Sequence, residues 1–545
     1  MTLANKFRFI LHRIAQIINP TPAPETIEWE MSGKDWVALI AASLAAFMAL
    51  IDIQIINSSL QLIESNLGMD FADGSWISTA YLISEVMVIP LTPILVDSLG
   101  LRTYLILGSA LFGFSSVLCA LSWNLPSIAT FRFIQGFFGG TLIPVIFQMI
   151  LIYMPSHRRN VGLSIFGLIA TLAPTIGPSV GGYIATYLGW RWIFFINIFA
   201  SALVIALTSI SFPKTEKSLR ILRRADWIGA LLICSALGCL TFALEEGGNR
   251  EWFNDSLVTV CIFITVICLP AFVIFELKKK TKPLLELRLF RSREFSLCTL
   301  ITFLAAQCLY GGMYALSIFL GAIHGYSPLE IGSILAWAGI PQIFIIPFLP
   351  ILMRKVDGRI LAIVGLALFA WSNWNNTGIN NDYGGNEFRW TLIQRAISQP
   401  FFTISLSALA IQKIVPSMAG AASSFINMIR NLGGSVGIAL VSYIINIHSS
   451  KYSEILQSLL NPIAPSMSEQ VTIMKNMLFV AGQDPSLAEI ASNKMISSQI
   501  LRESYFHCFN EVFEILTIEL LIAGVLVLLI PKPAPSKLGS TQAIH

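Results

Sequence analysis

Three ionisable side chains stand in long apolar runs of the sequence, where they could bind and release protons. Asp52 lies in ALIDIQIINSSLQLI, Glu85 lies in YLISEVMVIP, and Arg132 begins RFIQGFFGG. An ionisable group inside a membrane span costs at least about 2.5 kcal/mol, so each of these residues is a candidate for function. A carboxyl group held away from water favours its neutral form, which suits a group that loads and releases protons.

Asp52 is the strongest of these candidates. Gln54 and Asn57 follow it in the same apolar run and are further polar candidates for a cavity. Asp52 is either a proton carrier or a structural hydrogen-bonding residue, and we favour the proton carrier.

Arg132 needs an acidic or carbonyl partner if it is buried, because an uncompensated cation is costly in an apolar interior. Gln135 lies one helical turn further along the same face. We expect a switchable pairing of Arg132 with Asp52, which would tie protonation to the shape of the protein. Glu85 is either a second proton site, a cation-attracting group in the cavity, or part of a wet vestibule wall.

Two more charged residues are polar candidates for the cavity. Arg430 lies in INMIRNLGGSVG and could pair with a carboxyl group. Glu519 lies deep in the last apolar run, but the sequence identifies no partner for it, so a purely structural role is favoured over a functional one.

A P-loop, an HExxH motif and metal-ligand cysteine spacing are all missing from the sequence. Gly33 and Lys34 are followed by Asp35 rather than Ser or Thr, so no P-loop is present, and the six histidines form no HExxH motif. The eight cysteines show no metal-ligand spacing. We therefore expect no enzyme activity, no cofactor and no metal site, and the small net charge of +4, spread over loops, predicts no nucleic-acid partner.

One apolar run, GLIATLAPTIGPSVGGYI, is unusually rich in glycine and proline. Small residues let helices approach closely, and proline permits a bend. Ordinary close packing explains a GxxxG spacing alone, but so many residues of both types favour a helix that rocks against a neighbour. The residues concerned are Pro174, Gly177, Pro178, Gly181 and Gly182.

The elements that must position these residues are membrane-spanning helices. The 545 residues are 55% hydrophobic and only 12% charged, and apolar runs of about 20 residues, each long enough to cross a bilayer, recur along the chain. We predict an all-α polytopic protein with about fourteen spans, at 36–62, 76–96, 104–121, 128–152, 161–184, 192–210, 227–244, 257–275, 295–323, 331–352, 360–374, 390–411, 419–447 and 509–530.

The lysines and arginines of the connecting loops gather on alternate sides of this arrangement. Cytoplasmic loops carry the excess of Lys and Arg, so the alternation predicts an even number of spans with both termini in the cytoplasm.

The densest basic linkers flank the two middle spans, which predicts six helices, two inserted helices, and six helices. The predicted parts are a tail at 1–35, with either an interfacial helix or a disordered basic stretch, a six-helix bundle at 36–212, a linker with two extra spans at 213–294, a second bundle at 295–530 with a long outer loop at 448–505, and a tail at 531–545.

At these motifs the chain resembles the major facilitator superfamily, and within it the fourteen-helix drug:proton antiporters of the EmrB/QacA type. The first-span signature LDxTIVNVALP appears as IDIQIINSSLQ, RxxQGxG fits Arg132, Gln135 and Gly136, and GPxxGG is intact at residues 177–182. The loop motif GxLaDrxGrrxxl becomes PILVDSLGLRTYL. Its matching residues, Asp97, Gly100 and Arg102, are the expected gate loop, although Ser98 and Leu101 replace basic residues of the motif.

The resemblance implies a proton-coupled antiporter that exports small hydrophobic or amphipathic compounds by alternating access, in the multidrug efflux manner. GPxxGG is characteristic of antiporters in that superfamily, so export is the implied direction. The bacterial inner membrane is the expected location, and a periplasmic adaptor and an outer-membrane channel are conceivable partners. The alternatives are a dedicated exporter of one metabolite, such as a siderophore or fatty acid, and a non-transporting scaffold or receptor.

Overall fold

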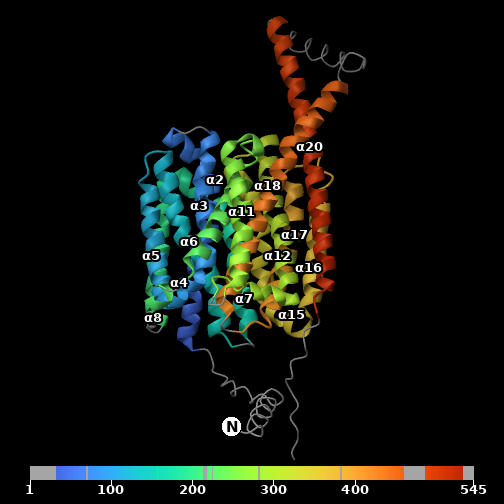
Figure 1. Ribbon diagram of the computed structural model, residues 1–545. Helices are drawn as coiled ribbons and strands as arrows, with labels where there is room; N and C mark the ends of the chain where they lie inside the picture. Colours follow the sequence, from blue (N-terminus) through green and yellow to red (C-terminus); the bar gives the residue numbers. More distant parts are fainter. Residues whose placement is uncertain are drawn as a thin grey trace, which may run out of the picture.

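The computed structural model is helical throughout the residues that it describes, which are 32–68, 71–155, 158–212, 218–223, 225–279, 283–380, 383–415, 418–459 and 485–531. Most helices run side by side as one bundle, and α18 and α20 project beyond it at one end (Figure 1). The N-terminal stretch for which the sequence allows either an interfacial helix or a disordered basic tail lies outside the described residues.

The first half of the chain forms a six-part helical bundle. Its second part bends where Pro90 and Pro93 interrupt the helix, because proline removes a backbone donor. The parts are α2 (Gly33–Leu67), α3 (Phe71–Val88) with η1 (Ile89–Leu91) and α4 (Thr92–Leu99), α5 (Leu101–Ala120), α6 (Leu125–Tyr153), α7 (Arg159–Tyr187) and α8 (Arg191–Ser211).

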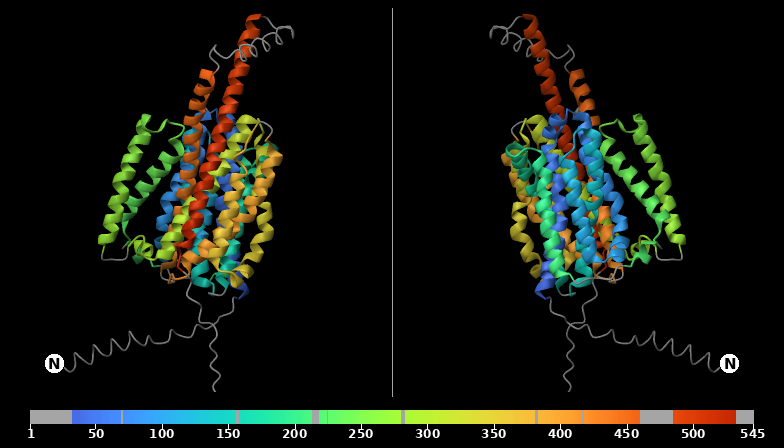
Figure 2. Two further views of the ribbon diagram at one scale, coloured as in Figure 1. Left: turned by 90° about the vertical axis from the view of Figure 1, so that its right-hand side faces the viewer. Right: turned by 90° about the vertical axis from the view of Figure 1, so that its left-hand side faces the viewer.

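A pair of helices follows this bundle and stands at its side (Figure 2). Its first member packs against α3 and α18, whereas the second packs mainly on the first and leaves most of its apolar surface uncovered. The elements of this region are α9 (Leu219–Arg223), α10 (Trp227–Glu246), η3 (Trp252–Asn254), α11 (Ser256–Lys278) and η4 (Leu287–Arg291).

The part of the chain from Arg293 to Leu528 forms a second six-part bundle. Its second part is broken into short helices by Pro341, Pro347 and Pro350. The parts are α12 (Arg293–Ile318) with η5 (Phe319–Ile323), α13 (Pro328–Leu335) with η6 (Ala336–Ala338), α14 (Ile340–Ile345), η7 (Ile346–Phe348) and α15 (Leu349–Lys355), α16 (Gly358–Trp374), α17 (Gly385–Ile411), α18 (Ala419–Leu459) and α20 (Pro485–Leu528).

The two bundles repeat the same pattern of helix neighbours. In the first, α2 packs on α6, α7 and α8, and α5 packs on α6 and α8; in the second, α12 packs on α17, α18 and α20, and α16 packs on α17 and α20. Taking the parts in chain order, the first, fourth and sixth helices of one bundle correspond to those of the other. This correspondence is what an internal duplication produces.

The predicted spans all fall on helices or runs of helices. Within the described residues, 10 helices are long and apolar enough to cross a membrane, and the apolar segments Arg159–Ala170 and Gly358–Trp374 are shorter. The all-helical, multi-pass architecture is therefore confirmed, while the count of fourteen spans stays a prediction. Helix α2 begins and α20 ends at the same end of the bundle (Figure 1). We call it the basic end because the loop lysines and arginines, such as Arg102 and Lys413, are predicted on this side.

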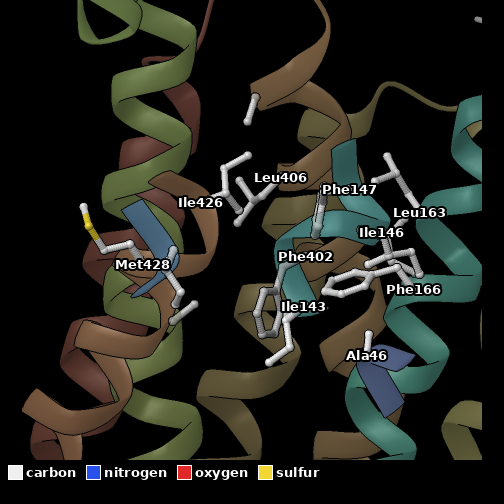
Figure 3. Packing of buried hydrophobic residues seen from close by; sticks show 14 of the residues in the cluster. Ala46, Ile143, Ile146, Phe147, Leu163, Phe166, Phe402, Leu406, Ile426 and Met428 are labelled. Atoms are coloured by element: carbon white, nitrogen blue, oxygen red, sulfur yellow. The ribbon is translucent and has the colours of Figure 1, made fainter. Parts of the chain in front are cut away.

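A hydrophobic core joins the two bundles. Phe147 of α6 and Phe166 of α7 lie with ring centroids 4.4 Å apart, close to Phe402 of α17 and Ile426 of α18 (Figure 3). All four side chains are buried. The two bundles are thus in extensive apolar contact, and the few buried polar residues are exceptions within this apolar interior.

Candidate functional site

A buried ion pair lies at the centre of the first bundle. Arg132 Nη1 on α6 stands 2.5 Å from Asp52 Oδ2 on α2, and both side chains are fully excluded from solvent. The pair is 80 residues apart in sequence, and its two helices pack directly on each other. The structure thus brings together the two residues whose pairing the sequence predicted.

Amide side chains from two other helices complete the coordination of Asp52. Gln135 Nε2 donates to Asp52 Oδ1 at 3.1 Å, and Asn197 Nδ2 of α8 donates to the same oxygen at 2.5 Å. Both amides also donate to Ser116 Oγ of α5, at 2.6 and 3.1 Å. Helices α6 and α8 therefore both bind the carboxylate of α2, and α5 is joined to this network through Ser116.

Arg132 is held by α3 as well as by its acid. Its Nε donates to the Ile77 carbonyl at 3.1 Å, and its guanidinium lies over the Tyr81 ring at 4.2 Å from the centroid. Its Nη2 has no hydrogen-bond partner. Protonation of Asp52 would remove the charge that holds Arg132 in place, so this network can convert a proton into a change of helix contacts.

The glycine and proline residues of α7 mark its closest approaches to other helices. A Cβ at Gly177 would stand 2.5 Å from Gln54 Cβ, and a Cβ at Gly332 of α13 would stand 3.2 Å from Pro178 Cβ. A Cβ at Gly182 would meet Leu329 at an ordinary 3.5 Å. Helix α7 thus contacts the first helix of its own bundle and the second bundle at once.

Four further predicted residues lie on α7 and α2. Gly181 is buried, and Gln54 is half-buried at the α7 contact. The side chains of Pro174 and Asn57 lie outside the described residues.

The expected gate loop lies at the basic end of the first bundle. Gly100 adopts φ +76°, a conformation that L side chains rarely adopt, and it separates α4 from α5. Arg102 Nη2 donates to the Ser209 carbonyl of α8 at 2.9 Å, and Asp97 is exposed. Ser98, which replaces a basic residue of the motif, is buried, and its carbonyl accepts a hydrogen bond from the Ser218 N–H at 2.9 Å.

Glu85 lies at the boundary between the two bundles. It is 2% exposed, and its Oε1 accepts a hydrogen bond from Asn431 Nδ2 of α18 at 3.0 Å, while its Oε2 has no partner. Arg430, next to Asn431, binds Asn427 Oδ1 at 2.9 Å and lies 5.4 Å from the Phe166 ring centroid. The prediction of a wet vestibule wall is wrong for this conformation, because the Glu85 side chain is sealed between α3 and α18.

Adjacent carboxylates at the end of α10 reach the two bundles separately. Glu246 Oε1 accepts from Thr79 Oγ1 of α3 at 2.8 Å, and Glu245 Oε1 accepts from Ser435 Oγ of α18 at 2.7 Å. Arg250 Nε stands 3.6 Å from Glu246. The predicted span 227–244 stops just before both acids, and the structure includes them in the helix.

Glu519 of α20 has partners that the sequence did not reveal. Its Oε1 accepts from Gln307 Nε2 of α12 at 3.0 Å, and its Oε2 accepts from the Cys308 thiol at 3.4 Å. It does not lie with the Asp52 network, since it belongs to the second bundle.

Several residues of these networks were missed by sequence reasoning. Asn197 and Ser116 are uncharged, and polar residues of this kind are common in apolar helices. Arg395, by contrast, carried a signal, because it is an arginine five residues inside the predicted span 390–411. It is 4% exposed in α17.

A cavity of about 350 Å³ opens between α7 and α15, well away from Asp52. Its walls are mainly apolar, with Leu168, Pro347 and Pro350 among the lining residues and Arg354 at its edge.

Comparisons with known proteins agree with the fold and the motifs. The family model of the Major Facilitator Superfamily matches residues 42–438. The chain is 32% identical over 520 residues to the colistin resistance protein EmrB of Acinetobacter baumannii, covering 93% of this chain and 98% of that protein. It is 26% identical to the multidrug export protein EmrB of Escherichia coli, covering 88% and 91%, and 26% identical to the fatty acid resistance protein FarB of Neisseria gonorrhoeae, covering 88% and 92%.

Among solved structures, the human organic anion transporter MFSD10 aligns with a TM-score of 0.57 at 13% identity, covering 89% of this chain and 99% of that one. At this identity the similarity establishes the fold alone.

Proposed function

Because this chain belongs to the Major Facilitator Superfamily, we propose that it is a proton-coupled antiporter that exports small hydrophobic or amphipathic compounds by alternating access. The observation that carries the proposal is the buried ion pair of Asp52 and Arg132. Burying two charges carries a desolvation cost that their attraction barely offsets, and apolar residues of similar size would give the same stability. The pair is therefore better explained by a role in transport than by a role in folding.

The proposed cycle uses the exchange of one proton on Asp52. With Asp52 ionised, Arg132 and the two amides hold α2, α6 and α8 together. Uptake of a proton neutralises the carboxylate and weakens its bond to Arg132, so the first bundle can rearrange against the second. Release of that proton on the inner side restores the pair and resets the transporter.

The close contacts of α7 support the rocking motion. Gly177 and Pro178 allow this helix to touch both α2 and the second bundle, so a tilt of one bundle is transmitted through it. Glu85, bonded to Asn431 across the boundary, is the proposed second protonatable group, and Arg430 is the nearby cation. The gate-loop residues Asp97, Gly100 and Arg102 are proposed to close the basic end.

The direct test is efflux driven by a proton gradient in proteoliposomes that contain the purified protein. Wild type is expected to expel a fluorescent lipophilic cation such as ethidium when the gradient is imposed. Asp52→Asn should abolish coupled efflux, and retention of full coupled transport by this variant would contradict the assignment of Asp52.

A dedicated exporter of one metabolite is the second candidate, and the fatty acid resistance protein among the relatives favours it. Growth of a pump-deleted host that expresses the chain, across toxic cations, detergents and long-chain fatty acids, separates the two candidates. Protection against one class only supports the dedicated exporter. A scaffold or receptor would show no substrate-stimulated proton flux.

We propose the bacterial inner membrane as the location, with both chain termini in the cytoplasm, on the basis of the loop charges. Docking on a periplasmic adaptor and an outer-membrane channel is part of the same proposal. Co-purification with such an adaptor from a native host tests it.

A further inference from the structure

The second bundle contains a buried cation with no acidic partner. Arg395 of α17 is 4% exposed, its Nη2 donates to the Leu309 carbonyl of α12, and its guanidinium lies 5.2 Å from the Phe369 ring centroid. Its Nε has no hydrogen-bond partner, and within the described residues no carboxylate oxygen lies within 4.0 Å of it. An arginine buried in a membrane protein normally pairs with an acid, so one is expected in reach.

Glu519 is a carboxyl that contacts α12 beside the residues that Arg395 contacts. This carboxyl bonds to Gln307 and Cys308, while Arg395 bonds to Leu309 and would lie 3.2 Å from a Cβ at Gly312. Both charged groups therefore approach the same stretch of one helix, from α20 and from α17. A rearrangement of α17 or α20 along α12 is therefore needed to bring the two groups into contact.

The internal repeat gives these residues counterparts in the first bundle. Arg132 and Arg395 stand on the fourth helix of their bundles. In the first bundle the acid, Asp52, is on the first helix, and Asn197 of the sixth helix donates to it at 2.5 Å.

In the second bundle the acid and the amide exchange helices. The acid, Glu519, is on the sixth helix, and Gln307 of the first helix donates to it at 3.0 Å. Each bundle thus brings one arginine, one carboxyl and one amide to the same three helices.

We propose that Glu519 is a second proton-binding carboxyl of the transport cycle, and that Arg395 is its counter-cation in another conformation. In the conformation described here Glu519 is neutral: the amide of Gln307 donates to the carbonyl oxygen Oε1, and the proton is held on Oε2, which lies 3.4 Å from Cys308 Sγ. When α12 and α20 shift, the proton leaves to water and the carboxylate pairs with Arg395. The transporter then moves one proton at each bundle, an inference that rests on the proposed proton-coupled export.

The first test needs no substrate and measures protonated carboxyl groups directly. Infrared difference spectra of the purified full chain between acid and alkaline pH report their C=O stretch. Glu519→Gln should remove one component of this band that Asp52→Asn leaves in place. Glu514→Gln is the matched control, since Glu514 is an exposed residue on the same helix, and an unchanged band in Glu519→Gln would overturn the proposal.

A gentler variant serves if Glu519→Gln does not fold. Cys308→Ala removes the thiol that donates to Glu519 Oε2, and it should shift the frequency of the same component. Cys298→Ala, a buried cysteine on the same helix, should leave it unchanged. Identical spectra for the two cysteine variants contradict the proposal.

The second test counts protons moved per ethidium in proteoliposomes. The ratio should fall by one in Glu519→Gln and return to the wild-type value in Glu519→Asp. If Glu519→Gln keeps the wild-type number of protons per ethidium, the inference about Glu519 is wrong and the proposed function is unaffected. Absence of any proton-driven ethidium efflux by wild type counts against the proposed function, while the infrared result still decides whether Glu519 binds a proton.

Discussion

Gly177 of α7 and Gln54 of α2 lie so close that a Cβ at position 177 would stand 2.5 Å from Gln54 Cβ. Real Cβ atoms essentially never approach so closely, so any side chain at 177 forces the two helices apart. The first helix, which carries Asp52, is thereby packed directly against the helix richest in glycine and proline.

Gly177→Ala should therefore destabilise the protein by about 1–3 kcal/mol, as overpacking does, and reduce efflux. Gly182→Ala is the matched control, because a Cβ there meets Leu329 at an ordinary 3.5 Å. Thermal melting of the detergent-solubilised protein measures the difference. Equal melting temperatures for the two variants would show that α2 and α7 separate freely.

Removal of one member of the buried ion pair should cost more than removal of both. Arg132→Met leaves the Asp52 carboxylate without its counter-charge and should cost about 3–5 kcal/mol. Arg132→Met combined with Asp52→Asn should recover much of this loss. Melting of the two single variants and the double variant forms the test, and strictly additive losses would mean that the pair is not coupled.

Helix α10 should be held to the second bundle by the bond between Glu245 and Ser435. Ser435→Ala leaves a carboxyl without its donor and should destabilise by about 1–3 kcal/mol, whereas Ser435→Ala with Glu245→Leu removes both polar partners and should be nearly neutral. Limited proteolysis of the loop between α10 and α11, together with melting, reports the release of α10. Protection that stays the same in Ser435→Ala would argue against this attachment.

An acid-sensitive contact lies just before α10. Burial raises the pKa of Asp226. The Lys279 Nζ at 2.5 Å and the Gly229 N–H together lower this pKa by more than burial raises it, so it lies below its usual 3.8. A lowered folded-state pKa stabilises the protein above the unfolded-state pKa, and this stability is lost as pH falls through the folded-state value.

Asp226→Asn should accordingly melt below wild type at neutral pH, and the gap should close at pH values below about 4. Glu251→Gln, at an exposed position of the next loop, is the control and should track wild type at every pH. A gap that stays constant into the acid range would exclude the ion pair as its cause.

The sequence was sufficient for the helices but not for their mutual register. Apolar runs locate each helix because length and hydropathy are local properties. Asp52, Arg132 and Gln135 were grouped correctly because a buried charge demands a partner and few were available. Asn197 could not be assigned to them, since nothing local indicates which face of α8 meets α2.

Partners far apart in the sequence could not be predicted either, because local sequence does not indicate which helix faces meet. Glu85 meets Asn431 across 346 residues, a pair that depends on how the two bundles are placed. Glu519 meets Gln307 across 212 residues, a pair that depends on how the first and last helices of one bundle pack. The predicted end of α10 at Leu244 is two residues too early. Glu245 and Glu246 resemble loop acids in the sequence, because only the fold supplies their hydrogen-bond donors on α3 and α18.

Helices α18 and α20 have 41 and 44 residues, which at 1.5 Å per residue gives each a length of about 60–65 Å. A hydrocarbon core about 30 Å thick covers only half of that, so the projecting halves form a stalk on the side opposite the basic end (Figure 1). A stalk of this kind acts as a lever: a few degrees of tilt at the bilayer centre becomes several ångströms at its tip. A protein bound at the end of the stalk would therefore be displaced each time the second bundle tilts.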